Sequence, residues 1–493
     1  MTARQLIDLI ADPGSLTGWD EPLGPPPADP RYRASLARAC ERTGLDEAVT
    51  TGRATLAGRP VALIVSEFDF LGGSIGVATA ERITRAVERA TAERLPLIAL
   101  PVSGGTRMQE GAAAFLCMLR VTAAVHAHRA AGLPYLTYLR NPTMGGVFAS
   151  WGTLGHLVLA EPGARLGFLG PRVYEQLRGE PLPPDIQRPD TLLARELIDA
   201  TVAPADLRDV LRRALTVLAP TTPASSAPAP SAPAPSAPAA AEPDEEPNGG
   251  DAWESVLRTR RTDRIGAREF LALAAEEFLP LGGSGALVHG LAVIGGHRLL
   301  AVGQQRQAPG GPARPFTAAD LRAVRRLAQT AGELGLPLLT VVDTTGAELS
   351  VRAELDGVAV EIAHCLHALT ALHTPVLAVL LGQGSGGGAL ALLPADRVLA
   401  AEHAWLAPLP PEGASAIVHR DGAHAPELAR AQGIRAHDLA AAGLVDRIVA
   451  EDPADTFPAR LGTAVAAALG ELTALPTPAL LAARAHRNRH LGG

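Results

Sequence analysis

Short apolar runs alternate with amphipathic stretches through most of the chain. Runs such as VALIVSE, PLIALPV, PYLTYL and PLLTVVD are four to eight residues long, almost wholly apolar and partly β-branched. This pattern predicts strands of a largely parallel sheet that is covered on both faces. Between them, AERITRAVERATAER and DLRAVRRLAQTAGELG repeat apolar residues every three or four positions opposite a charged face, which predicts helices. The chain is therefore expected to be an α/β protein.

The pattern occurs twice in one register. LPLIALPVSGGTR, which begins at Leu95, aligns with LPLLTVVDTTGAE, which begins at Leu336, at an offset of 241 residues. The same offset aligns LPYLTYLRNPTMGGVFAS with TPVLAVLLGQGSGGGALA. A further pair, GRATLAGRPVALIVSE from Gly52 and GLAVIGGHRLLAVGQQ from Gly290, aligns in nearly the same register. We infer a duplicated domain.

A low-complexity segment separates the two copies. Residues 219–250 are rich in Pro, Ala and Ser and carry acidic residues near their end, which predicts a disordered linker. The expected organisation is an N-terminal extension (1–50), a first domain (51–218), the linker (219–250) and a second domain (251–493). Such a linker is long enough for the two domains to dock within one chain or across two chains.

Composition narrows the class of protein. The chain has 493 residues, 47% of them apolar, and a net charge of −7, so it has no bulk basic field for nucleic acid. It shows no run of 18 apolar residues and no signal-peptide pattern, so a cytoplasmic protein without a membrane span is expected.

Cys40, Cys117 and Cys365 form no C-x-x-C pair, so no zinc is expected. All 44 basic residues are Arg, which excludes a Schiff-base lysine and a Walker-type phosphate loop.

Glycine-rich turns follow two of the predicted strands in each half. The four turns are Ser103–Arg107, Pro142–Gly146, Asp343–Gly346 and Gly384–Ala389. Glycine lets the backbone approach a ligand closely, and a helix that starts there has unpaired amides in its first turn. Such amides can bind an anion or a developing oxyanion. A single glycine turn is more typical of ordinary chain reversal, but four turns in two matched registers favour a site.

Longer motifs surround these turns. The first half contains FDFLGGSIG (68–76), SGGTRMQEG (103–111), NPTMGGVFAS (141–150) and AEPGARLGFLGPRVYEQ (160–176). The second half contains DTTGAELSVRAE (343–354), LGQGSGGGALAL (381–392) and PPEGASAIV (410–418). In these motifs the first half resembles the β subunit of the bacterial acetyl-CoA carboxylase carboxyltransferase, and the second half is similar to its α subunit. The resemblance implies two tandem domains of the ClpP/crotonase-type fold, with an active site between a β-type and an α-type domain.

The resemblance also implies the reaction. A carboxyl group would pass from carboxybiotin to acetyl-CoA or a related acyl-CoA and give malonyl-CoA or its analogue. Charge would build on the thioester oxygen and on the ureido oxygen of biotin, so two oxyanion holes are needed. The candidate donors are the backbone amides of Gly104, Gly105 and Thr106 in the first half and of Gly387, Gly388 and Ala389 in the second.

Further residues are expected to bind substrate. They are Gly145, Gly146 and Gly346, together with Arg107 and Arg172 as partners of the CoA phosphates. Each arginine is equally consistent with an ordinary surface or interdomain residue.

Three other motifs favour a structural interpretation. GGSIG at 72–76 matches the G-x-S-x-G pattern of hydrolases, but no acid and His follow it in recognisable order. His364, His367 and His373 lie in or beside apolar helical sequence without a carboxylate partner, which favours packed or surface histidines over a metal site. Glu110 and Glu412 are typical of carboxylates at helix starts rather than of catalytic bases.

Some family features are missing, and they define the partners. Residues 1–50 contain only Cys40, so the four-cysteine zinc ribbon of the β subunit is not expected. The α-subunit pattern DTPGAYPG is replaced by DTTGAELS at 343–350, near the expected biotin side. A chain without Lys cannot carry biotin by the usual linkage, so a separate biotin carboxyl carrier protein and biotin carboxylase are expected as partners. A homo-oligomer, a dimer or larger, is also expected.

Two other functions stay open at this point. A malonyl-thioester decarboxylase, similar to malonate decarboxylase subunits, would use related enolate chemistry without biotin. A non-catalytic scaffold subunit would bind acyl-CoA for a partner complex. Transfer of carboxyl from malonyl-CoA to free biotin would distinguish the carboxyltransferase from both.

Overall fold

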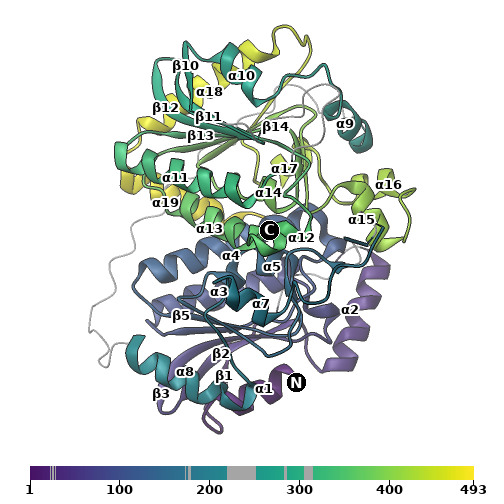
Figure 1. The fold of residues 1–493 in the computed structure, drawn as a ribbon, viewed down its shortest axis with the longest axis vertical. Helices are drawn as coiled ribbons and strands as arrows, with labels where there is room; N and C mark the ends of the chain where they lie inside the picture. Colours follow the sequence, from purple (N-terminus) through teal and green to yellow (C-terminus); the bar gives the residue numbers. More distant parts are fainter. Residues whose placement is uncertain are drawn as a thin grey trace.

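The structure, a computed structural model, describes most of the chain in two stacked layered units (Figure 1). The described residues are 1–22, 24, 27, 29–171, 174–175, 179–218, 251–281, 286–304 and 315–492. The predicted linker at 219–250 and the candidate residue Arg172 lie outside the described residues.

The first unit is built on a seven-stranded mixed sheet. Its strand order is β1 (Thr17–Gly18), β2 (Val49–Leu56), β3 (Arg59–Ser66), β4 (Leu97–Leu100), β5 (Tyr135–Leu139), β7 (Leu157–Ala160) and β9 (Ala200–Thr201). β1, β2 and β3 pair antiparallel, and the strands from β3 onward pair parallel. β4 and β5 are buried at every position, as expected of strands in a parallel sheet with both faces covered.

Helices cover both faces of this sheet (Figure 1). The outer face packs against α1 (Ala3–Ile10) and α8 (Pro204–Leu218). The inner face packs against α3 (Val77–Ala92) and α4 (Gly111–Ala130). The remaining elements are α2 (Pro30–Thr43), α5 (Gly145–Phe148), α7 (Pro189–Ala194), the short pair β6 (Thr143–Met144) and β8 (Leu166–Gly167), and the 3₁₀ turns η1 (Leu71–Gly73), η2 (Met108–Glu110) and η3 (Trp151–Thr153).

The second unit repeats this topology. Its strand order is β10 (Glu277–Pro280), β11 (Leu287–Ile294), β12 (His297–Gln304), β13 (Leu338–Thr344), β14 (Val376–Ser385), β15 (Arg397–Ala401) and β17 (Arg447–Val449), with β16 (Trp405–Ala407) paired to the end of β14. Its helices are α9 (Ala252–Thr259), α10 (Ala267–Ala274), α11 (Ala318–Leu334), α12 (Val351–Leu355), α13 (Val358–Ala371), α14 (Gly386–Leu390), α15 (Pro411–Val418), α16 (Ala425–Ala431), α17 (Ala436–Ala441), α18 (Phe457–Thr473) and α19 (Thr477–His490).

Strand pairing repeats residue by residue between the units. Leu97 lies opposite Tyr135 in the first sheet, and the residues 241 positions later, Leu338 and Val376, lie opposite each other in the second. The antiparallel pairs match in the same way: Gly52 lies opposite Leu63 in β2–β3, and their aligned counterparts Gly290 and Ala301 lie opposite each other in β11–β12. The protein is thus an α/β protein with two mixed sheets of one topology.

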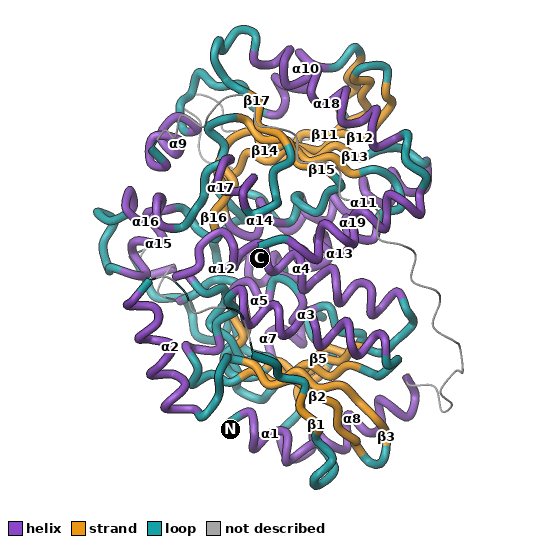
Figure 2. The backbone as a smooth tube through the Cα atoms, turned by 180° about the vertical axis from the view of Figure 1, so that it is seen from behind, coloured by secondary structure: helices purple, strands orange, loops and turns teal. Residues whose placement is uncertain are grey.

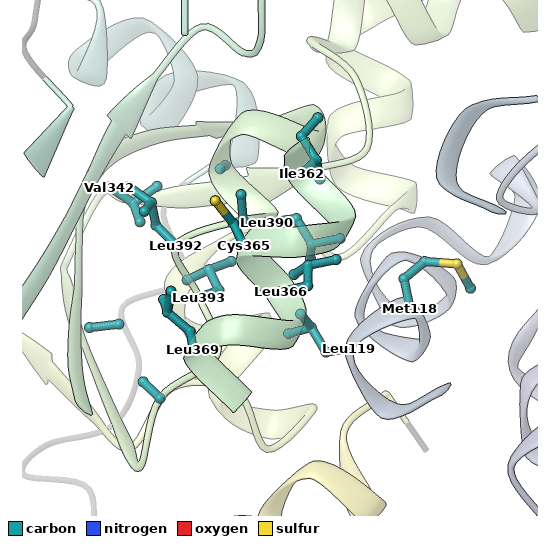
Figure 3. Close-up of a cluster of buried hydrophobic side chains, with 14 of the residues drawn as sticks. Met118, Leu119, Val342, Ile362, Cys365, Leu366, Leu369, Leu390, Leu392 and Leu393 are labelled. Carbon is teal, nitrogen blue, oxygen red and sulfur yellow. The ribbon is translucent and has the colours of Figure 1, made fainter. Parts of the chain in front are cut away.

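The two units share one core through α4 and α13, which lie between the sheets (Figure 2). Leu119 of α4 lies beside Leu366 of α13 in Figure 3, and both side chains are almost fully buried. α19 adds an ion pair across the units, since Arg489 donates to Glu81 at 2.7 Å. Docking within one chain, one of the two arrangements that the linker length allows, is therefore the arrangement in this structure.

The long apolar helix in the centre of the molecule is a core helix. The segment Met108–Ala130 is long and apolar enough to cross a membrane by length and composition, but 72% of its apolar window is buried inside the structure. Its contacts with α3 and α13 explain its apolar character without a lipid environment.

Residues 1–50 belong to the first unit. α1 packs on the outer face of the first sheet, β1 extends its edge, and β2 begins at Val49. Cys40, Cys117 and Cys365 are all free thiols. The segment therefore builds part of the sheet and its helical cover, with a different architecture from a zinc ribbon.

Candidate active site

The two glycine-rich turns of the first unit lie against each other where β4 and β6 end. A Cβ placed on Gly105 would lie 3.7 Å from the Cα of Gly145, and one placed on Gly146 would lie 2.8 Å from Thr106 Oγ1. The φ angles of Gly105 and Gly145 are 114° and 60°, a region that side chains rarely adopt. Backbone conformation favours glycine at Gly105 and Gly145, and the close approach to Thr106 favours it at Gly146.

The second unit repeats this arrangement. Gly346 and Gly386, each 241 positions after its counterpart, have φ angles of 123° and 58°. A Cβ on Gly388 would lie 2.8 Å from the backbone nitrogen of Ala347, so this pair of turns is also in direct contact. The structure thus brings the four predicted turns together as two equivalent pairs.

Local hydrogen bonds hold each turn in the same way. The amide of Gly105 donates to Ser103 Oγ at 3.0 Å, and the amide of Gly346 donates to Thr344 Oγ1 at 3.1 Å. A small hydroxyl side chain two residues before the glycine therefore fixes the turn in both units.

This geometry corrects part of the predicted oxyanion hole in the first unit. The amide of Gly104 donates to the carbonyl of Gly72 at 2.8 Å, and the amide of Gly105 donates to Ser103. Because both N–H groups are already used inside the protein, they are not available to a developing oxyanion. The start of α5, at Gly145 and Gly146, is the part of the first unit that corresponds to α14 in the second.

The predicted donors of the second unit lie at the start of α14. Gly387, Gly388 and Ala389 belong to the first turn of this helix, where amides have no carbonyl partner one turn earlier. All three residues are buried, whereas Gly145 and Gly146 are partly exposed. The turn of the first unit is therefore open in this structure, and the turn of the second unit is covered.

The structure does not support Arg107 as a partner of the CoA phosphates. Its side chain is only 1% exposed and donates to both carboxylate oxygens of Glu47, at 2.6 and 2.9 Å. Burial alone would lower the pKa of Arg107, but the hydrogen bonds and charge of Glu47 raise it above its usual value. A guanidinium that is buried and paired in this way is not available to a phosphate.

Arg107 instead fixes the turn that contains Gly105. It donates to the carbonyl of Ser74 at 2.9 Å and to the Tyr32 hydroxyl at 3.1 Å. Tyr32 in turn donates to Glu110, whose other oxygen accepts from the backbone amide of Val77 at the start of α3. Glu110 is therefore a helix-start carboxylate, as predicted, but it caps α3 rather than the helix that follows it.

Sequence reasoning missed Tyr32 and Glu47. Both belong to the N-terminal extension, and Glu47 lies 60 positions before Arg107 in the chain. No periodicity or motif links these positions, so only the folded chain shows that the extension supports the turn.

The other motifs behave as structural features. Ser74 Oγ donates to the carbonyl of Leu71 at 2.8 Å and accepts from Arg107, which is a turn contact rather than a nucleophile–base pair. Glu412, at the start of α15, accepts two hydrogen bonds from Arg260 at 2.6 and 3.0 Å. These bonds lower the pKa of the Glu412 carboxyl.

The histidines of α13 are packed side chains. The ring of His367 stands edge-on to the ring of His126 in α4, with 4.9 Å between centroids, and burial lowers the pKa of His367 to about 3. Nδ1 of His364 accepts a hydrogen bond from Arg325 at 3.0 Å. In the part of the chain that the structure describes, no group of three His, Cys, Asp or Glu side chains is placed to hold a metal ion.

An open cavity of about 720 Å³ lies between α11 and α13. Its polar lining residues are Arg322, Arg325, Arg326, Gln329, Glu333 and His373, and the rest of the lining is Gly, Ala and Leu. It contains none of the predicted site residues, so the glycine turns remain the candidate site.

Comparison with known proteins identifies the family. A family model described as carboxyl transferase domain matches residues 1–453. The "Probable biotin-dependent acyl-coenzyme A carboxylase beta3 subunit" of Mycobacterium tuberculosis is 52% identical and aligns over 100% of this chain and 99% of the relative. The "Acetyl-coenzyme A carboxylase carboxyl transferase subunits beta/alpha" of Salinispora arenicola is 40% identical over 100% of this chain and 91% of the relative.

A solved structure is also similar. The transcarboxylase 12S structure with methylmalonyl-coenzyme A and methylmalonic acid bound matches 97% of this chain and 90% of that chain, with 21% identity and a TM-score of 0.40.

Two paired sets of glycine turns on duplicated mixed sheets form the candidate site of this α/β protein. The chain belongs to the carboxyl transferase family, as the sequence motifs predicted, and it is an enzyme of carboxyl transfer.

Proposed function

We propose that this enzyme is the carboxyltransferase subunit of a biotin-dependent acyl-CoA carboxylase. It moves a carboxyl group from carboxybiotin on a carrier protein to acetyl-CoA or a related acyl-CoA. The observation that carries this proposal is the 52% identity over the whole chain to a relative named as a probable biotin-dependent acyl-coenzyme A carboxylase beta3 subunit. The two equivalent pairs of turns supply a physical basis, because the reaction develops charge on two different oxygens.

Each pair of turns has one part in this mechanism. The start of α5, with Gly145 and Gly146, receives the thioester oxygen of the acyl-CoA, because this turn is open. The start of α14, with Gly387, Gly388 and Ala389, receives the ureido oxygen of biotin. Gly105 and Gly346 contact the neighbouring turns. These contacts hold the backbone amides at the starts of α5 and α14 in place before substrate binds.

Proton balance follows from the substrates. Loss of the carboxyl group as CO₂ leaves negative charge on the biotin ureido group, which then takes the proton from the carbon next to the thioester. The resulting enolate attacks the CO₂ and gives the malonyl thioester. The amides of the two turns stabilise the two oxyanions, and no side-chain base of this chain enters the balance.

The proposal also includes the fold of the two units and the partners of the protein. Both units have the ClpP/crotonase-type fold. The biotin carboxyl carrier protein and biotin carboxylase are separate chains, because this chain lacks Lys for a biotin linkage. The protein works in the cytoplasm as a homo-oligomer.

The test is the reverse reaction with free biotin. Purified protein with malonyl-CoA should release acetyl-CoA slowly alone and much faster when free biotin is added, because biotin accepts the carboxyl group. The variant Arg4→Ala, at a side chain that is 75% exposed on α1, should behave like the wild type and serves as a preparation control. Rapid CO₂ release with no response to biotin would contradict the proposal and favour the decarboxylase. No turnover at all would favour the scaffold.

A further inference from the structure

Glu354 of α12, in the second unit, binds a loop of the first unit. Its carboxylate accepts hydrogen bonds from the amides of Phe168 at 3.2 Å and Leu169 at 2.5 Å. A third bond comes from Gln187 Nε2 at 3.2 Å. All three donors belong to the first unit, so one side chain of the second unit holds this loop.

The loop connects the two pairs of turns. β8 pairs parallel with β6, so Phe168, just after β8, leaves the strand pair at the same end as Gly145 after β6. The ring of Phe168 covers the other turn, since a Cβ on Gly387 would lie 3.1 Å from its Cζ. This contact accounts in part for the burial of Gly387, whereas Gly145 is partly exposed.

We propose that Glu354 is a positioning residue that holds Phe168 against the α14 turn and thereby sets how carboxybiotin meets the amides of that turn. The inference rests on the proposed function, in which the α14 turn serves the biotin side. It goes beyond that function by assigning a role to a residue outside the turns.

The chemistry of the side chain supports this role. Above its raised pKa of about 7 the Glu354 side chain is an ionised carboxylate, which has only acceptor sites and satisfies three converging N–H donors. In Glu354→Gln one oxygen becomes an NH₂ group, which points a donor at donors and breaks part of the set. Glu354→Asp keeps the acceptors but shortens the reach. The glutamine variant should therefore release Phe168 more than the aspartate variant does.

The experiment separates the two substrates. Biotin-dependent turnover of malonyl-CoA is measured while biotin is varied, and again while malonyl-CoA is varied. Glu354→Gln should lower kcat/KM for biotin by about tenfold, the scale of one lost hydrogen bond to a charged group. The KM for malonyl-CoA should stay within about twofold, because the open turn at Gly145 is unchanged.

Two further variants make the result specific. Phe168→Leu should reproduce the biotin-side loss, and the double variant should be little worse than the more impaired single variant, because both residues act through one contact. Arg352→Ala is the matched control on the same helix, since its side chain is 84% exposed, and it should match the wild type.

The outcomes are distinct. A loss confined to the biotin side and shared by Phe168→Leu supports the proposal. Unchanged kinetics in Glu354→Gln, or an equal loss for both substrates, overturns it. If Glu354→Gln does not fold, Phe168→Leu and Glu354→Asp decide by the same comparison of substrates. A wild-type protein that shows no biotin-dependent turnover would refute the proposed function rather than the role of Glu354.

Discussion

The buried ion pair between Arg107 and Glu47 offers the sharpest test of how the first unit supports its turn. The two side chains are 1% and 3% exposed, and two hydrogen bonds of 2.6 and 2.9 Å join them. Glu47→Ala removes one partner and leaves the guanidinium buried without its counter-charge. The expected cost is about 3–5 kcal/mol of unfolding free energy. For a unit of about 200 residues this corresponds to a loss of about 6–20 °C in Tm.

The assay is differential scanning calorimetry of the full chain with a double-variant comparison. Replacing both partners, as in Glu47→Leu with Arg107→Met, should cost less than Glu47→Ala alone, because no unpaired charge stays buried. The exposed pair Arg4–Asp8, with side chains 75% and 59% exposed, is the control, and Asp8→Ala should cost less than about 1 kcal/mol.

The Tm values of these variants can refute a stabilising role for the Arg107–Glu47 pair. If Glu47→Ala changes Tm no more than Asp8→Ala does, the pair does not stabilise the first unit. If the double variant is no more stable than Glu47→Ala alone, the penalty is not that of an unpaired buried charge. Turnover should fall together with Tm in Glu47→Ala, because Arg107 also fixes the turn that contains Gly105.

Three further predictions concern other parts of the molecule. Burial raises the pKa of Glu354 to about 7 from its ordinary value of 4.5, so between these pH values the folded state holds a proton that the unfolded chain has lost. The free energy of unfolding should therefore fall as pH rises from about 4.5 to 7. Urea titrations at several pH values should show that Glu354→Gln flattens this part of the pH profile. Gly388→Ala places a Cβ 2.8 Å from the nitrogen of Ala347 and should cost about 1–3 kcal/mol in urea unfolding, whereas Gly422→Ala meets nothing within 4 Å and should be neutral. Treatment with a metal chelator should leave Tm and biotin-dependent turnover unchanged, and a loss of either would contradict a metal-free site.

The Gly388 result also bears on what this glycine does. In the structure, the Cβ position faces the neighbouring turn at Gly346 and Ala347. Glycine is needed there because two backbone segments of the protein touch.

The sequence predicts the elements of the fold well where the signal is local. The apolar runs that become β4, β5, β13 and β14 are buried in both sheets, because a strand covered on both faces needs apolar residues at every position. The apolar pattern does not distinguish the antiparallel start of each sheet from its parallel part, because pairing direction depends on the connections between strands and not on the strand residues themselves.

The sequence predicts the candidate site only in part, because only part of its signal is local. The glycine turns carry local signals and a repeat register, so their positions follow from the chain. Which amides are free does not follow, because the amide of Gly104 is paired with the carbonyl of Gly72, which belongs to a different turn of the first unit. Arg172 lies outside the described residues, and its proposed contact with CoA stays a prediction.

The sequence by itself determines the duplication, the alternation of strands and helices, and the family. Each of these rests on residue order, because period, offset and motif are properties of the linear chain. The tertiary structure alone decides that Arg107 pairs with Glu47 and that Glu354 binds the loop at Phe168. These contacts join residues 60 and 186 positions apart, and a buried charge finds its partner only when folding excludes water from both groups.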